Sequence, residues 1–258
     1  MRTLFVGDVV GPRAVAWLAE RLPALRSEHA VDVVIVDAEN CAADGASMSV
    51  AGVEALLAAG ADVVTGGNHA FEGAEVHEVL AHERVLRPLN VGADVPGRGV
   101  LTLPVGDQTL RVVVLADRLA LADGPPFAHM AAQPYKAWAA LAPGPTTIVE
   151  MHALSVAGKQ ALAYALDGQV AAVLGTHTHE PTSALRLLPR GTALVTEVGM
   201  TGVHDSLQGM DPLAFVQRVQ GLPASELSPV RPADTGEIVL GAVLLEIEQG
   251  LTRSLRRL

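Results

Sequence analysis

Two histidines stand one residue apart in the stretch GTHTHEPT, which runs from Gly175 to Thr182. The apolar stretch AAVLG leads into it and predicts a buried β-strand. An imidazole can bind a metal ion or exchange a proton near neutral pH. Because one threonine separates His177 from His179, both rings can face one object if the backbone turns between them. The sequence therefore predicts a reactive or metal-binding site where this strand ends.

Other polar side chains also follow predicted strands. In α/β folds with parallel strands, ligands bind at the sheet edge where the carboxyl ends of the strands meet. Packing does not explain charged groups gathered at one buried edge, because their burial is unfavourable unless something offsets it. The residues that we expect to meet there are Asp8, Glu39, Asn40, Asn68, His69, His152, His177 and His179.

The chemistry of this set favours metal ions. Mixed oxygen and nitrogen ligands without thiolates suit Mn, Fe or Zn better than a closed structural zinc site. Leaving His69 aside, two carboxylates, two amides and three imidazoles exceed what one tetrahedral ion needs. They suit two ions that share a bridging carboxylate at a separation of roughly 3.5–4 Å. The pair of histidines in GTHTH would then give one imidazole to each ion.

Strand-like and helix-like segments alternate along the chain. This alternation predicts a largely parallel sheet covered on both faces, with the antiparallel segments at its edges or in a second sheet. No linker divides two cores, so we expect one domain over residues 1–258. Strands are predicted at 3–10, 31–40, 61–69, 99–117 (a hairpin), 145–152, 169–179 and 236–248, and helices at 13–29 (interrupted by Pro23), 49–60, 72–83, 155–168 and 211–219. The pattern changes after residues 192–202.

Composition limits the class of protein. Half of the 258 residues are apolar and the formal net charge is −10, which predicts a globular protein that does not bind nucleic-acid duplexes stably. A small anionic substrate remains compatible, because bound cations reverse the local field. A single cysteine, Cys41, excludes an intrachain disulfide. Without a signal segment or a membrane-length apolar run, we expect a cytoplasmic protein with no membrane contact. Homo-oligomerisation stays open.

The motifs GDVVG, DAEN, GGNH, MH and GTHTH occur in the order found in the calcineurin-like metallophosphoesterase superfamily. The chain resembles the bacterial YmdB-like branch of that superfamily most closely. This likeness rests on GDVVG, AEN and GTHTH, and also on the later stretches EVGMTG and DSLQGM. It extends from Leu4 to the last predicted strand.

The resemblance implies a four-layer α/β/β/α sandwich with the metal site at the carboxyl ends of its strands. It also implies two divalent metal ions per chain, with Fe or Mn favoured over Zn. The implied activity is hydrolysis of a small phosphoester, a 2′,3′-cyclic nucleotide, by a metal-activated hydroxide that attacks phosphorus. His69 would protonate the leaving oxygen. The implied ligands are Asp8, Glu39, Asn40 and His179 for one ion, and Glu39, Asn68, His152 and His177 for the other.

Several positions depart from the family patterns. The wider superfamily opens with Asp-x-His, whereas Val10 stands in the place of the histidine, and Glu39 replaces the usual bridging Asp. The YmdB-like branch shares both changes. Relative to that branch, GNHAFE replaces GNHTWD, which puts Glu72 in the place of Asp. HALS replaces HAEA, which puts Leu154 in the place of an acid. None of these changes removes a proposed ligand.

Each residue also has a structural interpretation. Asp8 could cap the following helix, and Asn40 and Asn68 could be turn residues. His204 is a loop residue or a substrate contact, and Cys41 is a small packing residue. The remaining histidines are expected outside the site: His29, His77, His82 and His129.

Two other functions remain open at this stage. The same metal site would serve a phosphomonoesterase or protein phosphatase. Alternatively, the chain would be a metal-binding regulatory protein that acts through protein contacts.

Overall fold

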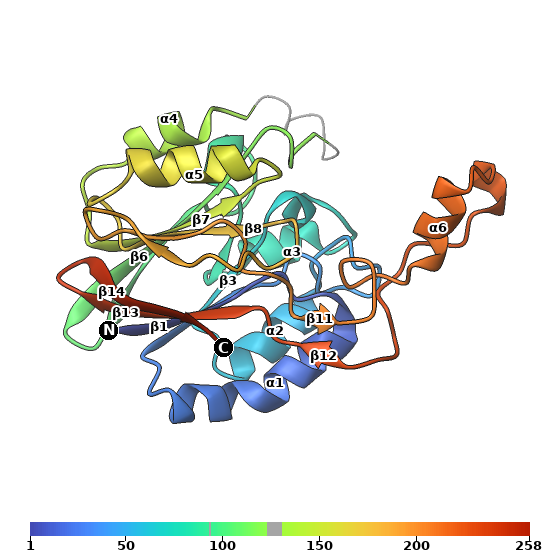
Figure 1. The fold of residues 1–258 in the computed structure, drawn as a ribbon, viewed down its shortest axis with the longest axis horizontal. Coiled ribbons are helices and arrows are strands. Elements are labelled where there is room, and N and C mark those ends of the chain that lie inside the picture. Colours follow the sequence, from blue (N-terminus) through green and yellow to red (C-terminus); the bar gives the residue numbers. More distant parts are fainter. Residues whose placement is uncertain (93, 123–130) are drawn as a thin grey trace.

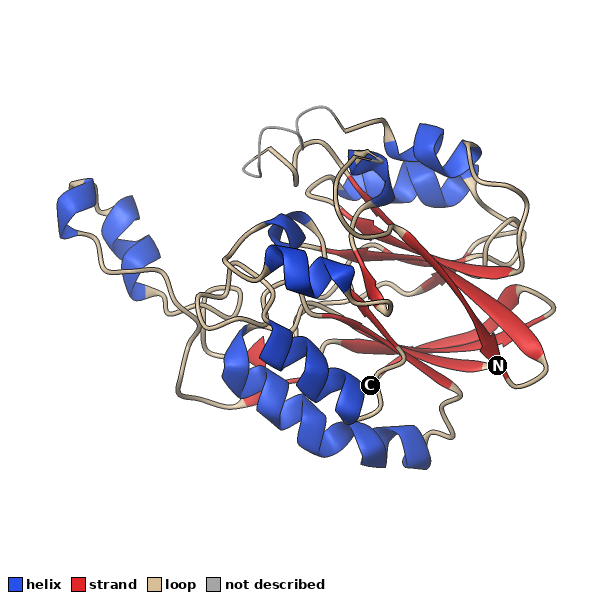
Figure 2. Cartoon of the chain, turned by 180° about the vertical axis from the view of Figure 1, so that it is seen from behind, coloured by secondary structure: helices blue, strands red, loops and turns tan. Residues whose placement is uncertain are grey.

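Two six-stranded β-sheets pack face to face, and helices cover their outer faces (Figure 1). This arrangement is seen in the computed structural model, which describes residues 1–92, 94–122 and 131–258. Figure 2 shows the two sheets between the helical layers from the opposite side. The expected α/β/β/α sandwich is therefore confirmed.

The first sheet contains both ends of the chain. Its order is β14-β13-β1-β2-β3-β4, in which β1 to β4 are parallel, β13 is antiparallel to β1, and β14 is antiparallel to β13. Its strands are β1 (Arg2–Val6), β2 (Val33–Asp37), β3 (Val63–Thr65), β4 (Val85–Leu86), β13 (Ala242–Glu248) and β14 (Leu251–Arg257).

The second sheet has the order β5-β6-β7-β8-β10-β9, with four parallel central strands and an antiparallel strand at each edge. The short strands β11 and β12 pair separately. These strands are β5 (Val100–Val105), β6 (Gln108–Ala116), β7 (Thr146–His152), β8 (Ala172–Thr176), β9 (Arg186–Leu187), β10 (Ala193–Val195), β11 (Gly202–Val203) and β12 (Ile238–Val239).

Two of the helices begin at serine caps. The side chains of Ser49 and Ser155 each accept a hydrogen bond from the backbone N–H three residues on. Within the described residues, no helix combines the length and the apolar character that crossing a membrane requires. The α-helices are α1 (Gly11–Glu28), α2 (Val50–Ala58), α3 (Val76–Ala81), α4 (Pro134–Ala139), α5 (Val156–Ala165) and α6 (Leu213–Val219), and the 3₁₀ turns are η1 (Asn68–Phe71), η2 (Leu89–Val91) and η4 (Ala224–Glu226).

The core follows the alternation of side chains along the strands. In β1, Leu4 and Val6 pack toward α1 and α2, whereas Phe5 packs between the two sheets. On the outer face of the second sheet, Val149 and Leu162 belong to a third cluster. Both sheets are thus buried on two faces, which explains why their central strands are continuous apolar runs.

The C-terminal region differs from the prediction. The strand expected over 236–248 is divided: β12 pairs with β11, and β13 begins only after Gly241. A side chain at Gly241 would collide with the backbone of Gly199, so the chain must pass closely there. β13 is also not an edge strand, because the unpredicted β14 covers it. The arginine-rich sequence of β14 is typical of an exposed edge strand and hides its strand character.

Helix boundaries differ as well. The expected interruption at Pro23 is wrong, because α1 continues through this residue. Pro23 is exposed, so the carbonyl that loses its helical hydrogen bond can bond to water. The helix expected over 72–83 shortens to α3, and the structure adds α4, which was not predicted.

Candidate metal centre

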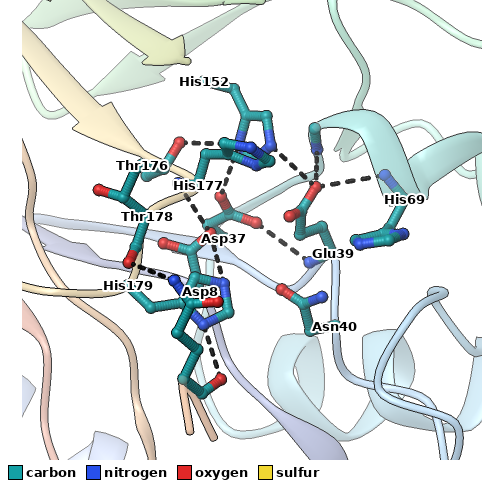
Figure 3. Close-up of polar contacts among 12 residues, drawn as sticks. Asp8, Asp37, Glu39, Asn40, His69, His152, Thr176, His177, Thr178 and His179 are labelled. Carbon is teal, nitrogen blue, oxygen red and sulfur yellow. Dashed lines mark hydrogen bonds and ion pairs between the residues drawn. The ribbon is translucent and has the colours of Figure 1, made fainter. Parts of the chain in front are cut away.

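The residues that were expected to meet do lie together, at the carboxyl ends of strands from both sheets (Figure 3). Asp8 follows β1, Glu39 and Asn40 follow β2, and Asn68 and His69 open η1 after β3. From the opposite sheet, His152 ends β7, and His177 and His179 follow β8. The first sheet therefore supplies the carboxylates, the amides and His69, and the second supplies the other three imidazoles.

Two overlapping groups of side chains could each hold a metal ion. Glu39, His152 and His177 form one group, and Asp8, Glu39 and His179 form the other, with ligand atoms within 4.8 Å of one another in each group. Glu39 belongs to both groups, as a bridging ligand would. A third group joins Asp8 and His152 with Asp37, the last residue of β2.

Hydrogen bonds fix the ring of His152. The Thr176 hydroxyl donates its one hydrogen to Glu150 Oε1 at 3.0 Å, so His152 Nδ1 must be the donor to Thr176 Oγ1, also at 3.0 Å. His152 Nε2 then carries a lone pair and faces two further acceptors, Asn68 Oδ1 at 2.9 Å and Glu39 Oε2 at 3.3 Å. A cation placed among these three acceptor atoms would satisfy all of them.

His179 is oriented by the stretch DSLQGM. Its Nδ1 lies 2.8 Å from the carbonyl oxygen of Gln208, to which only a protonated nitrogen can bond. His179 Nε2 therefore faces Asp8 Oδ1, 3.7 Å away, without a proton. Such a backbone bond to the far nitrogen is the usual support of a metal-binding histidine.

Buried oxygen atoms without partners mark the same place. Asp8 Oδ2, Asp37 Oδ2 and Asn40 Oδ1 are fully enclosed and accept no hydrogen bond. The Asn40 amide is oriented by its Nδ2, which donates to the carbonyl oxygen of Gly45 at 2.8 Å and leaves Oδ1 for the cluster. Buried polar atoms are rarely left unpaired, so these oxygens fit divalent cations.

Burial shifts the pKa values of the carboxyl groups in the cluster. Burial, followed by the charges of Glu197 and Glu39, raises the pKa of Asp8 well above its ordinary value. Burial likewise raises the pKa of Glu39 to about 7 and raises that of Asp37. These shifts arise because buried carboxylates resist ionisation near one another.

The imidazoles shift in the opposite direction. Burial lowers the pKa of His177 to about 4, and burial also lowers the pKa values of His152 and His179. All three rings are therefore neutral at pH 7, the form in which imidazole binds metals.

His69 differs from the other histidines of the cluster. Burial alone would lower its pKa, but a hydrogen bond to Glu72 and the charge of Glu39 raise it above the ordinary value. His69 Nδ1 lies 3.1 Å from Glu72 Oε1, and its side chain is 26% exposed. The ring is thus protonated more readily than a free imidazole and reaches solvent, which suits a proton donor.

The alternative structural roles can now be judged. Asp8 does not cap α1, whose N-cap is Val10. Neither Asn40 nor Asn68 adopts a left-handed turn conformation. Cys41 is buried, and its sulfur accepts the backbone N–H of Ser49 at 3.4 Å, which gives it a packing role.

His204 is exposed and pairs with Asp205, but it shares the wall of a cavity of about 250 Å³ with His179. Leu154 is half exposed. Of the remaining histidines, His29, His77 and His82 do not belong to the groups above, and His129 lies outside the described residues.

Four charged residues of the surroundings were not anticipated: Asp37, Glu150, Lys159 and Glu197. Two of them carry a signal in the sequence. Glu150 stands two residues before His152, so both side chains share one face of β7. Lys159 stands three and four residues before Leu162 and Ala163 on the buried face of α5. A charge on an apolar face indicates a buried partner.

Comparison with known proteins assigns the family. The family model described as YmdB-like protein matches residues 4–258. The chain belongs to the YmdB-like family. The resemblance inferred from the motifs is thereby confirmed.

This YmdB-like chain is related to a bacterial phosphodiesterase. It is 33% identical over 260 residues to the 2′,3′-cyclic-nucleotide 2′-phosphodiesterase of Bacillus subtilis (strain 168), which covers 99% of this chain and 95% of the relative. Phosphodiesterase homology thus extends over nearly its whole length.

Two solved structures resemble the YmdB-like chain closely. The crystal structure of a hypothetical protein from Thermus thermophilus has a TM-score of 0.88 and 35% identity, covering 99% of this chain and 97% of that one. The crystal structure of a novel phosphatase from Mycoplasma pneumoniae has a TM-score of 0.86 and 27% identity, covering 99% and 92%.

Replacement of one repelling carboxylate should have opposite effects with and without metal. We expect Asp8→Asn to raise the Tm of the chelator-treated YmdB-like protein by roughly 2–4 °C, the shift that about 1 kcal/mol gives in a chain of this size. The same change should reduce the Tm increase that Mn²⁺ produces, because it removes a charged ligand. Differential scanning fluorimetry measures both effects. Asp107→Asn, at an exposed position, is the control. A lower Tm without metal would contradict the electrostatic interpretation.

Metal affinity should depend on pH through the carboxyls. Because the pKa of Glu39 is raised to about 7, this group is protonated at lower pH and must lose its proton to bind a cation. The affinity for Mn²⁺ should therefore rise as the pH increases toward 7, by about tenfold per pH unit for each proton displaced. Isothermal titration calorimetry in two buffers of different ionisation enthalpy measures the affinity and the protons released. A midpoint near 6.5 that moves in a His177→Ala variant would instead assign the titration to the histidines.

Proposed function

We propose that this protein is a dinuclear-metal phosphodiesterase that hydrolyses 2′,3′-cyclic nucleotides. One observation carries the proposal: two groups of buried ligands share Glu39 in a chain that matches a 2′,3′-cyclic-nucleotide 2′-phosphodiesterase over 99% of its length. The negative net charge is no obstacle, because bound cations would present a positive surface to the phosphate.

The two ions would divide the ligands between them. The first would take Asp8, Glu39, Asn40 and His179, and the second Glu39, Asn68, His152 and His177. The unpaired oxygens of Asp8 and Asn40 support the first set, and the convergence of acceptors on His152 Nε2 supports the second. When bound, two such ions supply Lewis acidity toward a phosphoryl group. The mixture of oxygen and nitrogen ligands favours Fe or Mn, with Zn as the alternative.

His69 would donate the proton that hydrolysis requires at the leaving group. In this reaction the oxygen of a water molecule bonds to phosphorus, and the bond from phosphorus to one ribose oxygen breaks. That oxygen must gain a proton to leave as a hydroxyl. Glu72 accepts a hydrogen bond from His69 Nδ1, which leaves Nε2–H free for this transfer. Glu72 thereby has a role in spite of its departure from the family pattern.

The proposal is tested by metal content and a substrate panel. Elemental analysis of fully loaded protein should approach two equivalents of Mn or Fe per chain. The loaded protein should hydrolyse 2′,3′-cyclic nucleotides faster than nucleoside monophosphates. A saturating content of one equivalent would contradict the dinuclear site. Preference for monoesters would identify a phosphomonoesterase. An absence of turnover, together with cellular activity in an Asp8→Ala variant that lacks metal, would indicate a regulatory protein.

The role of His69 is tested by the choice of leaving group. His69→Ala should keep both metal ions and lower kcat for a cyclic nucleotide by roughly 10²–10⁴-fold. The loss should be smaller for a nitrophenyl diester, because nitrophenolate leaves without a proton. His77→Ala, at an exposed position on α3, is the matched control. Loss of metal in step with activity would make His69 a ligand, and equal losses on both substrates would assign it to phosphate binding.

A further inference from the structure

The two histidines of GTHTH adopt an unusual backbone conformation. His177 has a φ of 93° and His179 a φ of 63°, both in the left-handed region that residues with a β-carbon disfavour. This turn lets both imidazoles face the cluster, whereas the hydroxyl of Thr178 points away from it (Figure 3). A conformation of this kind persists only where the surroundings impose it.

A single carboxylate holds the residue between the two histidines. Glu197 Oε2 accepts the backbone N–H of Thr178 at 3.0 Å and the Thr178 hydroxyl at 2.6 Å. Its other oxygen, Oε1, accepts the backbone N–H of Gly199 at 3.1 Å. Glu197 is buried, so these bonds are shielded from water.

Lys159 completes the arrangement from the neighbouring helix α5. Its ammonium group donates to Glu197 Oε2 at 3.0 Å and to the carbonyl oxygen of Thr176, directly before His177, at 2.7 Å. The side chain of Lys159 is fully buried. Lys159 therefore fixes the start of the turn, and Glu197 fixes its middle.

A buried ion pair is a poor means of stabilising a fold, because removing two charges from water offsets most of their attraction. Such pairs are better explained by the geometry that they impose. Here the imposed geometry concerns both groups of candidate ligands, because His177 belongs to one and His179 to the other.

We propose that Lys159 and Glu197 are positioning residues that set the turn at Thr178 and so deliver one imidazole to each metal ion. The inference rests on the proposed metal binding but not on the identity of the phosphoester. Loosening the turn should weaken both metal sites together, whereas removing one ligand weakens its own site first.

Thr178 offers a matched pair of variants. Thr178→Val keeps the shape of the side chain but removes the hydroxyl bond to Glu197, and Thr178→Ser keeps that bond. We expect Thr178→Val to lower Mn²⁺ affinity at both sites by roughly 10–100-fold, the usual effect of losing an outer partner of metal ligands. Thr178→Ser should restore affinities close to the wild type. Glu197→Gln should resemble Thr178→Val, because an amide cannot accept at both of its positions.

Calorimetric titration with Mn²⁺ gives the two affinities, and the absorption spectrum of bound Co²⁺ reports the ligand geometry. Thr182→Val is the control, because it removes a comparable hydroxyl contact, with Thr196 at 2.8 Å, outside the turn. Unchanged affinities and an unchanged Co²⁺ spectrum in folded Thr178→Val would overturn the proposal, as would an effect at one site alone. Since wild-type metal binding is measured in the same titration, a protein that binds two ions without hydrolysing cyclic phosphates would refute only the proposed function.

Discussion

Repulsion among buried carboxylates governs the architecture around the cluster. Asp8, Asp37, Glu39 and Glu150 are enclosed between the sheets, and burial raises the pKa of each. Backbone N–H groups and the Thr176 hydroxyl offset part of this repulsion. Four buried oxygens of this region, on Asp8, Asp37, Asn40 and Glu150, still lack partners. The fold therefore keeps several carboxyl groups close together in a buried place, where bound cations would stabilise their ionised forms.

The two sheets supply different kinds of candidate ligand, which follows from the same constraint. The carboxylates of the candidate ligand groups come from the first sheet: Asp8, Asp37 and Glu39. The imidazoles of these groups come from the second sheet: His152, His177 and His179. Neither sheet alone would hold a complete set. The apolar contacts between the sheets, such as those of Phe5 and Ile148, therefore determine the distance between oxygen and nitrogen ligands. Small changes in this inter-sheet core act on the site without touching it.

The sequence predicts the strands and their polar ends well, because apolar runs and abrupt polar residues are local signals. It does not predict β14, because this arginine-rich segment lacks the apolar run that marks the other strands. The assembly of the cluster follows from the parallel arrangement of the strands, but its supports do not. Glu197 and Lys159 lie far from the histidines in sequence, and their roles depend on a left-handed turn that no local pattern encodes. The sequence does not single out Asp37 either, because an aspartate at the end of a strand is common.

The pairing of β1 with β13 has a consequence for synthesis on the ribosome. Asp8 follows β1, whose neighbour β13 is formed by residues 242–248. β1 therefore gains this pairing partner only after residues 242–248 have been synthesised. The last strand then adds Arg257, which donates to the carbonyl oxygens of Thr182, Glu197 and Val198 beside the second sheet. Contacts so distant in sequence form late and slowly. The contacts that support the candidate metal site are therefore completed only after residues 242–257 have been synthesised.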